Sequence, residues 1–298
     1  MPVHELVYKR MAERPQGKPR NQAWAISSYG FRLAYRSKLA WMITVPSFFP
    51  AAIIIFIMYL SQEMADGVGN NLARQLAQIT STDNDGWTVG AAPAIRFLLD
   101  LQLWFVTFLA AFKGAPIVSE DVSKHALDMY LSRPISPLTY ALGKLLTIMR
   151  GLFIVEVLPL TLVIVSAWAL LPGCFQHAKP LGLYTLLAAL WVVFAFAALA
   201  VGVSSIGKSA RFAVIAWFTL TFFTFLAGNV LSLATDTPEF AYISFRHDVL
   251  TVAAWIIGLP NSVPDGAEDP FAAMAALCVY FGLAGFALYR RLRRGILA

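Results

Sequence analysis

Apolar residues fall into six long runs that are separated by shorter polar stretches. Each run is close to the roughly 20 residues that an α-helix needs to cross about 30 Å of hydrocarbon. The pattern therefore predicts an all-α integral membrane protein. Its six transmembrane helices are expected at about residues 39–60, 97–117, 146–171, 183–206, 212–234 and 270–289.

Two shorter segments differ from these spans. From Trp24 to Trp41, aromatic side chains alternate with basic ones, which suits the headgroup level and predicts an amphipathic helix in the inner interface. A basic flank without a fixed helix is the alternative. The apolar run at 249–259 is too short to cross, so we expect a re-entrant segment in the outer leaflet, with an ordinary surface helix as the alternative.

This pattern divides the chain into two parts. Residues 1–38 form a cytoplasmic tail and the interfacial helix, and residues 39–298 form the six-span transmembrane domain. The domain includes one long polar loop on its basic side, at 113–145. A soluble partner could act on the membrane part through this loop.

The polar loop itself carries a helical pattern from Ile117 to Ser132. Its apolar side chains recur every four residues, and a charged stripe runs beside them. The apolar positions are Val118, Val122, Ala126 and Tyr130, and the charged ones are Glu120, Lys124 and Asp128. The spacing predicts a short amphipathic helix.

A sharp corner is predicted after this helix. Arg133 precedes Pro134 and is pushed out of the helical region, so the helix must end there. Ser136 and Pro137 then supply an N-cap and a first-turn proline for a new helix that leads into the third span.

Composition agrees with the membrane interpretation, because 58% of the 298 residues are hydrophobic and only 13% are charged. The net charge of +6 does not indicate nucleic-acid binding, because the basic residues alternate between the two sides of the spans. Eighteen lie on one side, and the other side holds only Arg74, Arg96, Lys179 and Arg246. This positive-inside pattern predicts that both termini are cytoplasmic.

Two carboxylates lie within the predicted spans. Asp100 is near the outer end of the second span, where a structural role and a transport role are both open. Glu156 lies about ten residues into the third span, so it should face other helices or a wet cavity. A substrate-path or gating role for Glu156 stands beside a structural one.

Catalytic and cofactor chemistry is not expected in this chain. Gly202 to Ser209 matches the phosphate-loop pattern G-x-x-x-x-G-K-[ST], but that mechanism needs a preceding strand, and this string ends an apolar span. Cys174 and His177 offer only two metal ligands where zinc needs three or four. We therefore expect no catalytic, cofactor or metal site. An intramembrane enzyme using Glu156 and a membrane scaffold without transport remain alternatives.

The loop sequence resembles the cytoplasmic loop of ABC-2 type transporter permeases. The resemblance rests on Glu120-Asp121, then Ala126 to Ser132, then Arg133-Pro134-Ile135-Ser136, with Tyr140 and Gly143-Lys144 at the entry of the next span. The family typically shows Gly-Thr where this chain has His125-Ala126, and either Glu120 or Asp121 can be the family's acidic residue. The interfacial helix, six spans and re-entrant segment are similar too.

The resemblance implies the membrane subunit of a bacterial inner-membrane ABC exporter. Two such permeases pair, either two copies or two homologous chains, and each contacts a separate cytoplasmic ATPase that binds ATP and magnesium. Coupling is expected through the helix at 117–132, with Asp100 and Glu156 as candidates for the translocation path. The expected coupling residues are Val118, Glu120, Asp121, Val122, Lys124, Ala126, Tyr130, Arg133 and Pro134.

Overall fold

The computed structural model describes residues 21–65, 91–124, 126, 135–170, 175–207, 209–258 and 269–297. This part of the chain is helical and contains no strand. Six helices are long and apolar enough to cross a membrane, which confirms the predicted all-α, six-span class. The six are Lys38–Leu60, Phe97–Ser123, Pro137–Leu170, Gly182–Ile206, Ala210–Thr235 and Pro270–Arg293.

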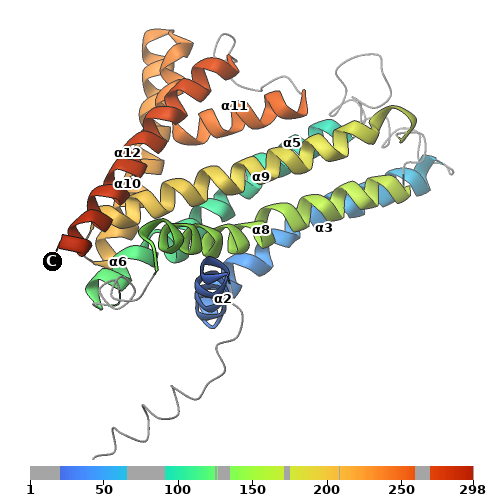
Figure 1. Ribbon diagram of the computed structural model, residues 1–298. Coiled ribbons are helices and arrows are strands. Elements are labelled where there is room, and N and C mark those ends of the chain that lie inside the picture. Colours follow the sequence, from blue (N-terminus) through green and yellow to red (C-terminus); the bar gives the residue numbers. More distant parts are fainter. Residues whose placement is uncertain are drawn as a thin grey trace, which may run out of the picture.

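The centre of the bundle is α9 (Phe175–Ile206). Figure 1 shows it between α3 (Lys38–Ala65) and α8 (Pro137–Leu170) on one side and α11 and α12 (Pro270–Leu297) on the other. In the apolar stretch of α9, 67% of the residues are buried, against 17% in α10 (Ala210–Thr235) and α12. The outer surfaces of α10 and α12 therefore face lipid or another protein.

The first five residues of the phosphate-loop-like string lie in this central helix and not in a loop. Gly202 to Ile206 form the last turn of α9. A Cβ atom at Gly202 would clash with Ala284 of α12, so the glycine is needed for the close approach of two helices. The structure therefore explains Gly202 by packing.

The second span is longer than predicted. It runs through α5 (Ala91–Leu109), a π-turn η1 (Ala110–Gly114) and α6 (Pro116–Ser123). The helix predicted from Ile117 to Ser132 is thus not separate at its start, because α6 continues the span; α6 ends at Ser123, and residues 127–132 lie outside the described residues. The Ser123 hydroxyl donates to the Glu120 carbonyl, a side-chain bond that competes with the helical ladder.

Some of the predicted loop lies outside the described residues. This holds for Asp128, Tyr130, Arg133 and Pro134, and therefore for the predicted corner. The predicted start of the next helix is confirmed, because α8 begins at Pro137 and the Ser136 hydroxyl accepts the Thr139 N–H at 3.1 Å. The helix that contains the third predicted span therefore begins at Pro137, before the predicted span itself.

Two further helices match the shorter predicted segments. The interfacial segment forms α2 (Gln22–Tyr35), which crosses the beginning of α8 at a steep angle in Figure 1. The apolar run before the last span forms α11 (Phe245–Ile257), which ends at Gly258 with a φ of 77° and packs against α9 and α12. Its 13 residues are too few to cross the membrane.

Candidate functional site

A buried ion pair joins the end of the second span to the beginning of the third. The Lys144 ammonium lies 2.6 Å from Oδ2 of Asp121, and the Tyr140 hydroxyl donates to the same oxygen at 2.7 Å. The Lys144 and Asp121 side chains are only 9% and 16% exposed. We call Asp121, Tyr140 and Lys144 the inner contact. Because removing one partner of a buried ion pair is costly, this contact holds α6 against α8.

The sequence places these groups together through helix geometry. Tyr140 and Lys144 are one turn apart on α8, so both side chains face α6. Tyr140 is fully buried and also packs with Leu292 of α12 and with Val122 of α6. The inner contact therefore links the second, third and sixth spans at one end of the bundle.

The two neighbouring acids of α6 have different environments. Asp121 is held inside the inner contact, whereas the Glu120 side chain is 46% exposed and lies 3.9 Å from the exposed Lys124 ammonium. Exposed pairs of this kind contribute little to stability. Of these two carboxylates, Glu120 is the one accessible from outside the bundle.

The apolar stripe of the predicted coupling helix faces inward where it is described. Val118 is fully buried, and its N–H and that of Ser119 donate to the Ser204 hydroxyl at 2.8 and 3.1 Å. Val122 packs against the core, and Ala126 is partly buried. These apolar side chains hold α6 on the bundle, so the outer surface of α6 is formed by its polar side.

The interfacial helix α2 is attached to the same part of α8. The Arg150 guanidinium lies over the rings of Trp24 and Phe31, at 4.5 and 4.9 Å, and donates to the Ser28 hydroxyl at 3.2 Å. Its contacts show that it binds a neighbouring helix.

A second ion pair lies at the other end of the second span. Nη2 of Arg246, on α11, donates to the Asp100 carbonyl at 2.8 Å and to its Oδ1 at 2.7 Å. The guanidinium also stacks on Trp104, 4.2 Å from the ring centre. We call Asp100, Trp104 and Arg246 the outer contact.

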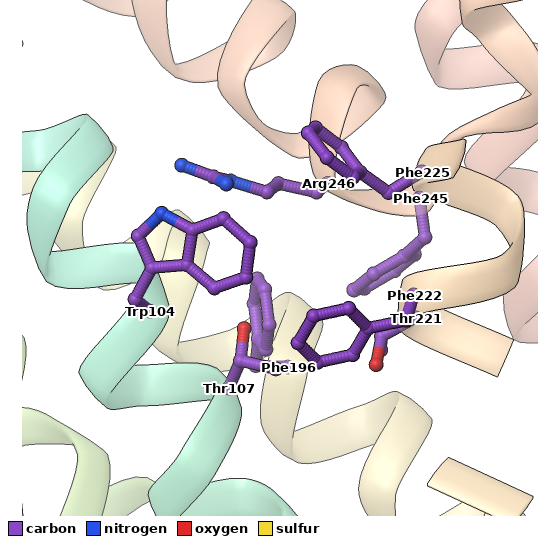
Figure 2. Close-up of a pocket in the computed structure, with 8 residues that line it drawn as sticks. All are labelled: Trp104, Thr107, Phe196, Thr221, Phe222, Phe225, Phe245 and Arg246. Carbon is purple, nitrogen blue, oxygen red and sulfur yellow. The ribbon is translucent and has the colours of Figure 1, made fainter. Parts of the chain in front are cut away.

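A small aromatic hollow lies beside the outer contact. Figure 2 shows rings from α5, α9, α10 and α11 around it, with Arg246 at its edge. The hydroxyls of Thr107 and Thr221 point into this region but donate to carbonyls of their own helices. The hollow is therefore mainly apolar and contains no reactive group.

Two buried carboxyls are separate from both contacts. Asp248 on α11 is fully buried, and neither of its oxygens has a hydrogen-bond partner among the described residues. Burial raises the pKa of Asp248 to about 8. Glu156 on α8 is likewise fully buried, with both oxygens unpartnered in the described part of the chain. Its expected place in a translocation path stays a prediction.

Sequence reasoning missed several partners in these contacts. Tyr140 and Lys144 belonged to the family resemblance, but nothing in the local pattern paired them with Asp121. Ser204, Trp104 and Arg246 carried no signal, because each meets a residue more than 80 positions away or on another helix. Within the described ranges, no three His, Cys, Asp or Glu side chains gather in a metal-binding group.

Comparison with known protein families gives one match over most of the chain. The family described as "ABC-2 family transporter protein" matches residues 24–294. The match includes most of α2, all six spans and both ion pairs. Comparison with curated individual proteins gives no match.

Proposed function

Because this chain belongs to the ABC-2 family of transporter proteins, we propose that it is the membrane subunit of an ATP-driven exporter in a bacterial inner membrane. A separate cytoplasmic ATPase binds ATP and magnesium, and both termini of this chain lie on that side. The observation that carries the proposal is the inner contact, which ties the continuation of the second span to the third span.

The inner contact suits the transmission of a movement. A force on α6 acts directly on the second span, since α5, the π-turn and α6 follow one another without a loop. Through Asp121 it also acts on α8, which is one helix from Pro137 to Leu170. A displacement at one membrane face therefore reaches two spans together.

Glu120 provides the polar point at which the ATPase engages. It is exposed beside Lys124, next to the residue that carries the inner contact. In this arrangement Glu120 contacts the ATPase and Asp121 passes the displacement on. The parts of the loop beyond Lys124, including Tyr130, Arg133 and Pro134, extend this contact.

A second permease chain completes the translocation path in this proposal. The largely exposed α10 and α12 leave apolar surface for a second copy or a homologous chain as well as for lipid. Asp100 and Glu156 are the ionisable groups on the spans that the path could use. A scaffold without transport would need the same partner surface but no ATP-dependent movement.

The test is co-purification of this chain with an ATPase encoded beside it, together with measurement of ATP hydrolysis in vesicles. We expect the wild type to retain the ATPase and Glu120→Lys to lose it. Glu239→Lys is the matched control, because Glu239 is also exposed but lies in η3 (Pro238–Ile243), on the predicted opposite side.

Two results would contradict the proposal. Retention of the ATPase by Glu120→Lys at wild-type levels would remove Glu120 from the contact. If the wild type binds no ATPase, or binds it without any ATP-dependent transport, the scaffold alternative replaces the transporter. Size-exclusion profiles of all three proteins in detergent establish that each is folded.

A further inference from the structure

A shallow, open hollow lies between the end of α2, the π-turn and the first half of α8. Its wall is mostly apolar, and it includes the ring of Tyr35, the side chain of Lys113 and the bare backbone of Gly151. The coupling to the ATPase that is proposed above, through α6 and the inner contact, does not involve this hollow. It lies on the face of the bundle where the interfacial helix is attached.

Lys113 is the only cationic side chain in the wall of this hollow. It lies on the π-turn Ala110–Gly114 and is partly buried, and within the described residues it has neither a hydrogen bond nor an ion pair. The Glu120 carboxylate interacts electrostatically with Lys113, but its ion pair is with Lys124. A charge in apolar surroundings is costly unless it is paired, so this ammonium calls for an anion.

The other polar groups of the hollow do not supply that anion. The Tyr35 hydroxyl donates to the Gly151 carbonyl at 3.2 Å, and the Thr147 hydroxyl donates to the Gly143 carbonyl at 2.8 Å. Lys113 is thus the donor left for a ligand. The site fits a small group with negatively charged oxygens and an apolar attachment.

The position of α2 indicates where such a group comes from. Tyr29 and Leu33 are exposed on this helix, and the basic residues Arg36 and Lys38 that follow it are exposed too. Aromatic, apolar and basic side chains on one short helix are typical of the headgroup level of an anionic leaflet. At that level the common oxyanion with an apolar attachment is a lipid phosphate.

We propose that this hollow binds the phosphate of an anionic phospholipid of the inner leaflet, with Lys113 as its ionic partner. The lipid phosphate lies at the open side of the hollow, between α2 and the second and third spans, and so supports the attachment of the interfacial helix. The proposal needs only the membrane location of the chain. It does not depend on the proposed ATPase partner.

Gly151 allows a second, charge-independent test. A Cβ atom there would be 3.6 Å from the Tyr35 ring and 3.8 Å from Leu109, which are ordinary contacts. Gly151→Ala therefore fits the helix, yet its methyl group occupies part of the hollow. Lys113→Gln removes the charge and leaves the space, so the two variants separate charge from shape.

The experiment is native mass spectrometry of the delipidated full chain in detergent, titrated with phosphatidylglycerol or with phosphatidylcholine. We expect one molecule of phosphatidylglycerol to be retained in preference to phosphatidylcholine. Loss of one charged hydrogen bond should weaken that retention about tenfold in Lys113→Gln. Gly151→Ala should weaken it too, and Lys113→Arg should preserve it.

Lys124→Gln is the matched control, since it removes the same charge from an exposed position outside the hollow. Equal weakening by Lys124→Gln and Lys113→Gln would overturn the proposal in favour of general surface attraction. So would equal retention of the two lipids by the wild type. Displacement of phosphatidylglycerol by inorganic phosphate at the same concentration would show a free-anion site and not a lipid site. Unfolding temperatures of each variant establish that the folds are unchanged.

Discussion

The inner and outer contacts use the same second span and nearly the same ion-pair distance, 2.6 and 2.7 Å, but they differ in burial. At the inner contact both charged side chains are largely buried. At the outer contact Arg246 is buried against aromatic rings, whereas the Asp100 side chain is 58% exposed. The ion-pair distance alone therefore does not show which of the two pairs contributes more to stability.

The difference in burial has energetic consequences. Breaking a buried pair leaves a charge without its partner in a low-dielectric region, which typically costs about 3–5 kcal/mol. Breaking an exposed pair costs about 1 kcal/mol or less, because water replaces the lost partner. We infer that the inner contact contributes more to stability, because both of its charges are buried, whereas at the outer contact the Asp100 carboxylate stays in water.

The largest expected effect comes from Asp121→Ala. It removes the carboxylate that balances the buried Lys144 ammonium, so the free energy of unfolding should fall by about 4 kcal/mol. Thermal unfolding in detergent, followed by tryptophan fluorescence, measures the change. Adding Lys144→Met to this variant should recover most of the loss, because the remaining charge is then removed. If the double variant is no more stable than Asp121→Ala, the uncompensated Lys144 charge is not the cause of the lost stability.

A second effect concerns the outer end of the bundle, where the Asp248 carboxyl is buried without a partner. Burial raises its pKa to about 8, against about 3.9 in an unfolded chain. Between these values the unfolded chain releases a proton that the folded chain keeps, so stability must fall as the pH rises. From pH 5 to pH 7.5 the fall should be on the order of 3 kcal/mol.

Asp248→Asn tests this dependence. The variant should lose this part of the pH dependence and be more stable than the wild type at pH 7.5. Unfolding temperatures at several pH values, with Asp100→Asn as the control for an exposed carboxylate, provide the measurement. If the unfolding temperatures of the wild type and of Asp248→Asn changed with pH in parallel, the assignment of Asp248 as a buried acid would be contradicted.

The smallest effect is expected at the outer contact itself. Arg246→Gln loses the ion pair and the stacking on Trp104, but it leaves Asp100 in contact with water. The free energy of unfolding should therefore fall by only about 1–2 kcal/mol. The loss of stability in Arg246→Lys should be smaller than in Arg246→Gln but not zero, since lysine keeps the charge and loses the planar stacking. A loss as large as that of Asp121→Ala would remove the distinction between the two contacts.

Much of the fold follows from local sequence. Six apolar runs of membrane length are sufficient to predict six spans, because a bilayer of fixed thickness allows few other structures. The start of α8 was readable from Ser136 and Pro137, and α2 was readable from its mixed aromatic and basic residues. In each case the signal lies within one turn or one helix.

Only the tertiary structure decided which residues meet. It assigned Asp121 to the interior and Glu120 to the surface, a choice that their adjacent positions left open. It also gave Arg150 a partner on α2 and Arg246 a partner 146 residues away. Hydrophobic length is a property of one segment, and the sequence by itself determined it. Pairing depends on the rotation and depth of two helices packed together, which no single segment specifies.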